Sequence, residues 1–153
     1  MRKVLGYDDF SKLILSYGSF SHKKLQKLSY YVYSWYLTLY GEKIADVNFE
    51  AWVHGPVSPE IYSLYKNYGW KDIPKYTGCI KINDIINSRV EAIIEEYIDL
   101  DANELEKRTH KELPWRLARE GYEKYESSNE IIDDDIIINY YESSELFNVL
   151  SHN

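Results

Sequence analysis

The segment between Ser21 and Gly41 constrains the fold more than any other part of the sequence. Its large apolar residues recur at helical spacing and form one stripe: Leu25, Leu28, Val32, Trp35, Tyr36 and Leu39. Further tyrosines lie around the other sides of the same predicted helix: Tyr30, Tyr31, Tyr33 and Tyr40. A helix that is apolar on several sides is covered on more than one face. We therefore expect a long central helix that ends at Gly41, with partners for its buried tyrosine hydroxyls.

Capping signals divide the rest of the chain into shorter helices. Ser58-Pro59 predicts a helix start, because serine caps and proline suits the first helical position. Asp101 and Glu104 have the spacing of a capping box. Other helices are expected at about residues 8–18, 83–98, 114–119 and 134–143, with a further turn at 146–150. Candidate caps for the first two are Asp8 or Asp9 and Asn83 or Asp84.

A small amount of β structure is also expected. Residues 47–53 alternate apolar and polar side chains, which is the period of a strand. The run Cys79-Ile80-Lys81-Ile82 resembles a second strand that could pair with the first, and Gly55-Pro56 is expected to interrupt the ladder. The predicted fold class is mainly α (α+β), a compact single-domain bundle of about six to seven helices with a two-stranded β-ribbon. A chain of 153 residues suits one domain, over residues 1–153.

Charge is distributed unevenly along the chain. Residues 1–78 hold 10 Lys+Arg and 7 Asp+Glu, a net charge of +3, whereas residues 79–153 hold 8 and 18, a net charge of −10. An acidic half argues against a general nucleic-acid binder, which needs clustered cations. The basic cluster consists of Arg2, Lys3, Lys12, Lys23, Lys24 and Lys27. We interpret it as a solvated helix face, with contact to an acidic partner or DNA as the alternative.

The sequence contains no motif for a cofactor site and none for a membrane segment. The four histidines lack metal-site spacing, and no phosphate loop or dinucleotide fingerprint is present, so no metal and no cofactor are expected. The single cysteine, Cys79, excludes an internal disulfide and is expected to point into a sheet face. Since no signal peptide and no long apolar run are found, we expect a cytoplasmic protein that does not enter a membrane.

The stretch FEAWVHGPVSPEIYSLY, residues 49–65, allows two interpretations. His54 and Glu60 could form a catalytic pair beside a helix N-terminus. Alternatively, His54 braces the turn or contacts a partner, and Glu60 supports the helix start. No third catalytic member is visible, so we expect architecture that serves a binding surface and no enzyme activity. Thr109 and His110 are likewise expected to brace the loop between two helices.

Four segments together resemble the Panacea domain, the family of SocA-type antitoxins. They are KLQKLSYYVYSWYLTLYGEKI (24–44), FEAWVHGPVSPEIYSLYKNYG (49–69), THKELPW (109–115) and IIINYY (136–141). The resemblance spans about residues 8–145 and implies a mainly helical bacterial or prophage antitoxin that neutralises a cognate protein toxin. It also implies a possible role as an adaptor that delivers the toxin to the ClpXP protease. Because the resemblance leaves no room for an appended DNA-binding segment, a repressor function is not expected.

The candidate partner-binding residues fall into two groups. Trp52, His54, Glu60 and Tyr62 lie near the Gly-Pro turn, and Asp133, Asp134 and Asp135 form an acidic segment. Aromatic residues dominate binding hot spots, and an acidic segment suits a basic toxin. The alternative hypothesis is a standalone phage protein that binds a host factor.

Overall fold

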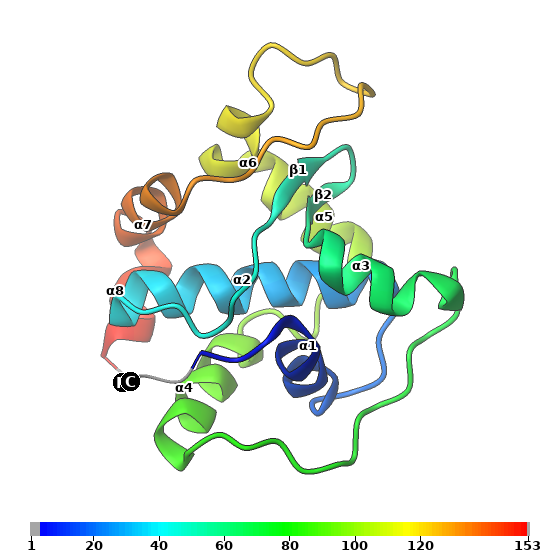
Figure 1. Cartoon of the computed structure of the whole chain (residues 1–153). Coiled ribbons are helices and arrows are strands. Elements are labelled where there is room, and N and C mark those ends of the chain that lie inside the picture. Colours follow the sequence, from blue (N-terminus) through cyan, green and yellow to red (C-terminus); the bar gives the residue numbers. More distant parts are fainter. Residues whose placement is uncertain (1–3, 153) are drawn as a thin grey trace.

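The predicted central helix is the axis of the fold. The computed structural model describes residues 4–152, in which α2 (His22–Tyr40) runs through the middle of the molecule (Figure 1). The Ser21 side chain accepts a hydrogen bond from the Lys24 amide at 3.2 Å, and Gly41 ends the helix with a φ of 66°. The predicted start near Ser21 and the predicted end at Gly41 are confirmed. Tyr30, Tyr31 and Trp35 are almost fully buried, so α2 is covered on several sides as expected.

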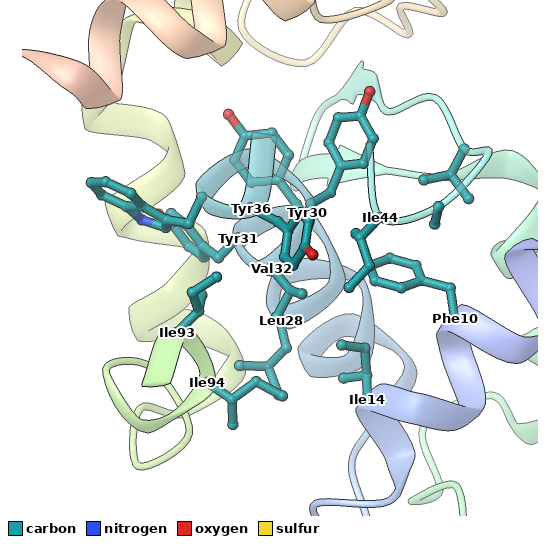
Figure 2. Close-up of a cluster of buried hydrophobic side chains, with 14 of the residues drawn as sticks. Phe10, Ile14, Leu28, Tyr30, Tyr31, Val32, Tyr36, Ile44, Ile93 and Ile94 are labelled. Carbon is teal, nitrogen blue, oxygen red and sulfur yellow. The ribbon is translucent and has the colours of Figure 1, made fainter. Parts of the chain in front are cut away.

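Short helices surround α2. In chain order they are α1 (Tyr7–Leu15), α3 (Pro59–Tyr65), the 3₁₀ turn η1 (Lys66–Tyr68), α4 (Asp84–Glu95), α5 (Ala102–Lys111), α6 (Leu113–Ala118), α7 (Asp134–Glu142) and α8 (Glu145–Ser151). The helices α1, α4, α5 and α7 all pack directly on α2. Figure 2 shows Phe10 and Ile14 of α1 on one side of α2 and Ile93 and Ile94 of α4 on another. The mainly α class is confirmed.

Most of the predicted caps are present. Ser58 accepts from the Ile61 amide, Asn83 accepts from the Ile86 amide, and Asp101 and Glu104 form the full capping box. The cap predicted for the first helix is wrong. Gly6 is its N-cap, so Asp8 and Asp9 lie in the first turn, two and three residues after the cap. There they still face the positive end of the helix dipole.

The β-ribbon is a hairpin, and its predicted pairing with residues 79–82 is wrong. Strand β1 (Glu50–Trp52) pairs antiparallel with β2 (Gly55–Val57), and residues 53 and 54 form the two-residue turn. Gly55 has a φ of 109°, which suits a tight turn, so the glycine forms the ladder and does not break it. Residues 79–82 adopt no strand, and Cys79 is exposed and does not face a sheet.

A tyrosine cluster lies around the middle of α2; it comprises Tyr30, Tyr31, Tyr97, Tyr141, Trp35 and Glu112. The hydroxyls of Tyr31 and Tyr141 each donate to Glu112 Oε1 at 2.8 Å. The hydroxyls of Tyr30 and Tyr141 lie 3.0 Å apart, and the Trp35 indole donates to the Tyr97 hydroxyl at 2.7 Å. Burial raises the pKa of Glu112 to about 7. The tyrosine hydroxyls of the cluster therefore have the partners that their burial requires.

Candidate functional site

The hairpin packs on a buried lysine of α2. Lys27 is only 1% exposed, and its Nζ donates to the Pro56 carbonyl at 3.0 Å. A Cβ atom at Gly55 would lie 2.5 Å from Lys27 Cε, so only glycine leaves room for this side chain. Burial lowers the pKa of Lys27 to about 7. The Gly-Pro pair is thus matched to one side chain of the central helix.

A second α2 side chain fixes the end of β2. Gln26 is buried, and its Oε1 accepts from the Ser58 amide at 2.8 Å while its Nε2 donates to the Ser58 carbonyl at 3.2 Å. Ser58 in turn caps α3, whose first residue is Pro59. The segment HGPVSP therefore has a structural function at most of its positions, as expected.

The interpretation of the basic cluster as a solvated face is wrong for α2. Lys27 is buried, the Lys23 ammonium forms an ion pair with Glu106, and Lys24 donates to the Ile98 carbonyl at 2.6 Å. Lys27 lies on the side of α2 that faces the hairpin. The burial of Lys27 could not be predicted from residue type, because lysine is rarely buried. Arg2 and Lys3 lie outside the described residues.

Four predicted residues lie on the outer side of the hairpin and the start of α3; we call Trp52, His54, Glu60 and Tyr62 the hairpin patch. The rings of Trp52 and Tyr62 are in contact, with centroids 5.1 Å apart. Glu60 accepts from the Ser58 hydroxyl at 3.1 Å, which places it at the root of α3. The His54 side chain is 72% exposed and Tyr62 is 40% exposed. The structure therefore brings Trp52 and Tyr62 together and leaves His54, at the turn, and Glu60, at the start of α3, exposed.

His54 and Glu60 have different partners. His54 Nδ1 lies 3.4 Å from Glu106 Oε2, and Glu106 also pairs with Lys23. Burial works to raise the pKa of Glu106, but the hydrogen bond and charge of Lys23 outweigh it, so the pKa is lowered. The histidine and carboxylate that the catalytic interpretation paired are thus engaged separately.

His110 braces the joint between α5 and α6, as predicted. Its ring stacks on Trp115, with centroids 3.9 Å apart, and the Trp115 indole donates to the Trp52 carbonyl at 2.9 Å. Thr109 donates to the Glu106 carbonyl within α5. Burial lowers the pKa of His110, and its buried Nε2 atom makes no hydrogen bond, although it lies 3.9 Å from Glu106 Oε2.

Two clefts flank the hairpin turn. The aromatic cleft has a volume of about 580 Å³ and is lined by Val53, His54, Glu106, His110, Trp115, Arg119, Tyr122, Lys124 and Tyr125. The apolar cleft has a volume of about 300 Å³ and is lined by Trp52, Val53, His54, Val57, Ser127, Ser128 and Asn129. Since Val53 and His54 line both, the turn forms a ridge between them. The loop after α6, which lies beside the hairpin in Figure 1, contributes residues to both linings.

Arg119 holds that loop in place, although no sequence motif pointed to this role. One guanidinium nitrogen donates to the Ala51 carbonyl of β1 at 2.9 Å. Another donates to the carbonyls of Glu123 and Glu126 at 2.9 and 2.6 Å. Arg119 is 6% exposed, so a single buried cation links the hairpin to the loop that walls both clefts.

The acidic candidates lie elsewhere, at the start of α7. Asp133 caps this helix by accepting from the amides of Asp135 and Ile136. Asp134 accepts from the Tyr33 hydroxyl at 2.8 Å and lies 3.6 Å from Lys43 Nζ. Asp135 is exposed. Two of the three carboxylates therefore support local structure, and Asp135 is the one most available to a partner.

Metal-ion clusters and membrane-spanning helices are absent from residues 4–152. In this part of the chain, no cluster of three or more His, Cys, Asp or Glu side chains is placed to hold a metal ion. None of the helices described for these residues has the length and apolar character needed to span a bilayer.

Comparison with known proteins decides the family. The family described as "Antitoxin SocA-like, Panacea domain" matches residues 25–116, which is more than half of the 153 residues. The chain belongs to the SocA-like Panacea family. No curated protein and no solved structure matches it. The Panacea match contains α2 from Leu25 onward, the hairpin patch, α5 and the part of α6 up to Arg116. The wall loop after Arg119 and the acidic segment of α7 lie beyond it.

Proposed function

We propose that this protein is an antitoxin that neutralises a cognate protein toxin by binding it, without covalent chemistry. The observation that carries the proposal is the match of the SocA-like antitoxin domain to residues 25–116. The resemblance seen in the sequence leads to the same class of activity. The partner is a protein, and the proposed place of action is the cytoplasm of a bacterium.

The hairpin patch is the proposed contact surface for the toxin. Trp52 and Tyr62 combine partial exposure with ring contact, and aromatic residues of this kind are the usual anchors of protein interfaces. The scaffold beneath them is rigid, because Lys27 and Gln26 bind the backbone of the hairpin and of Ser58. A surface held in place before binding loses little conformational entropy on association.

Two finer statements belong to the same proposal. The antitoxin delivers its toxin to a protease of the ClpXP type, and the pair is encoded by a prophage or bacterial toxin-antitoxin locus. The family description supports the antitoxin part, and the proteolytic step is a separate proposal. It predicts that toxin levels fall faster in cells that contain both this protein and ClpXP.

The test is to express the product of the adjacent gene alone and together with this protein. Growth arrest by the neighbour alone, relieved by co-expression, is the expected result. A Trp52→Ala/Tyr62→Ala variant should fail to relieve the arrest while keeping its thermal stability. A harmless neighbour, or toxicity that co-expression leaves unchanged, contradicts the proposal.

The alternative, a phage protein that binds a host factor, gives a different result in the same cells. Capture from host lysate should then yield one chromosomally encoded protein, and the Trp52→Ala/Tyr62→Ala variant should lose it. The adjacent gene product would be absent from the captured material.

A further inference from the structure

The apolar cleft has a lining that differs from its neighbour. Its floor consists of Trp52, Val53 and Val57, and its wall is the extended segment 127–129. The exposed ionisable side chain in this lining is His54. A volume of about 300 Å³ is at the small end of ligand pockets and suits one large side chain of a partner.

The surroundings of this cleft are acidic. Residues 47–59 and 125–132, which contribute all of its lining, include no lysine and no arginine, but hold three acidic residues: Glu50, Glu126 and Glu130. Glu126 and Glu130 border the wall segment in the chain and are exposed. Glu50 accepts from the Trp52 indole at 2.9 Å. A positively charged segment would therefore be attracted to the rim of this cleft.

The cations of adjacent elements do not cancel this charge at the cleft. Lys27 is buried behind Pro56, and Arg119 is buried and bound to three backbone carbonyls. Lys124 is exposed, but it lines the aromatic cleft on the other side of the ridge and lies over the Tyr125 ring. The two clefts thus differ in charge as well as in lining.

Hydrogen bonds from neighbouring side chains fix the two sides of the apolar cleft. Arg119 fixes the loop that leads into the wall, and the Trp115 indole fixes the Trp52 carbonyl on the floor side. Ser128 is 4% exposed, and its hydroxyl accepts from the Glu130 amide at 3.1 Å. Both sides of the cleft are therefore held by side-chain hydrogen bonds, which lowers the conformational entropy lost on binding.

We infer that the apolar cleft receives one large apolar side chain of the partner, and that this side chain is flanked by lysine or arginine. The inference rests on the proposed binding function and adds the chemistry of the recognised segment. The acidic rim guides the basic flanks, and the floor of Trp52, Val53 and Val57 buries the apolar side chain.

The test uses the purified full chain and blocked peptides. Gly-Arg-Phe-Lys-Gly is titrated into isotope-labelled protein, with Gly-Glu-Phe-Asp-Gly and Gly-Arg-Ser-Lys-Gly as matched controls. We expect saturable shifts at Trp52, Val57 and residues 127–129 with the first peptide, and at least fivefold weaker binding of either control. Equal binding of the acidic or serine peptide, shifts at other sites only, or no binding overturns the inference.

Paired variants separate the effect of side-chain charge on peptide binding from the effect of disrupting the cleft. Val53→Lys and Val53→Glu alter the same position, and the lysine variant should bind the basic peptide roughly tenfold more weakly than the glutamate variant. Glu126→Gln/Glu130→Gln should weaken binding, whereas Glu142→Gln/Glu145→Gln, with the same charge change on α7 and α8, should not. Equal affinities within either pair contradict the acidic-rim argument.

These peptide measurements need no toxin. If the peptide binds at the cleft but the adjacent gene product is harmless, the antitoxin proposal is rejected and the cleft assignment stands. If co-expression relieves the toxicity but the peptide does not bind at the cleft, the cleft assignment is rejected and the antitoxin proposal stands.

Discussion

The middle of α2, which carries the tyrosine cluster, and its N-terminal half, which faces the hairpin, treat buried polar groups differently. In the tyrosine cluster, Glu112 accepts from two hydroxyls, and each tyrosine hydroxyl has a partner. At the hairpin end, Lys27 bonds one carbonyl and His110 Nε2 has no hydrogen bond, although both are largely shielded. The first region is a closed network that specifies packing. The second ends in two clefts and an exposed ridge, which is where a partner can reach the protein.

The largest expected effect comes from Gly55→Ala at the hairpin end. The new Cβ would lie 2.5 Å from Lys27 Cε and 3.0 Å from Thr109 Oγ1, at a φ of 109°. We expect a loss of about 3 kcal/mol or more in the free energy of unfolding, measured by urea denaturation. Gly41→Ala is the control, because its φ is also positive, in the left-handed helical region, but no atom lies within 4 Å of the new Cβ. It should cost about 1–2 kcal/mol. Equal losses would show that backbone strain, not the fit to Lys27, explains the glycine.

Glu112 makes the tyrosine cluster sensitive to pH. Its pKa rises from 4.5 to about 7 on folding, so the folded state binds its proton more tightly. The resulting stability is present below pH 4.5 and is lost as the pH rises towards 7, by about 2–3 kcal/mol. Glu112→Gln should remove this decline, and chemical denaturation between pH 5 and pH 8 measures it. An unchanged slope in the variant would contradict the assignment to Glu112.

Lys27 has the opposite pH dependence at the hairpin end. Its pKa falls from 10.5 to about 7 on folding, so the unfolded chain binds the proton more tightly. The free energy of unfolding should increase as the pH rises from about 7 to about 10. Lys27→Met keeps most of the side-chain volume and should abolish this increase. At pH 7 it should change stability by only about 1–2 kcal/mol in either direction. A variant that retains the pH dependence would place its source elsewhere.

The smallest stability effect is expected at His54. Its side chain is 72% exposed, so His54→Ala should change the free energy of unfolding by less than about 0.5 kcal/mol. Loss of toxin neutralisation with an unchanged melting temperature would identify a contact residue. A clear loss of stability would instead assign His54 to the support of the turn.

The sequence was informative where a local rule decides the structure. Ser21, Ser58 and Asn83 cap the expected helices, because a cap needs only its own residue type and the amides that follow it. The aromatic stripes of α2 likewise required a central helix. Trp52 and Tyr62 were chosen from the same short stretch and do lie in contact.

Features set by distant contacts could not be predicted in this way. Two three-residue strands carry too few side chains to define their pairing, so the partner of β1 was misassigned. The burial of Lys27 depends on Gly55 and Pro56, which lie about 30 residues away. Arg119 depends on carbonyls of β1 and the wall loop, and carbonyls have no sequence signature.

The bonds made by Gln26 and Lys27 also restrict how a partner can attach. On the outer side of β1, the Ala51 amide donates to the Glu130 carbonyl and the Ile132 amide donates to the Phe49 carbonyl. On the outer side of β2, side chains of α2 bind the backbone of Pro56 and Ser58. Neither border of the hairpin therefore offers a free ladder for strand addition, a common route to aggregation and peptide capture. Recognition here has to proceed through side chains, so partner specificity should change with single surface substitutions while the backbone stays the same.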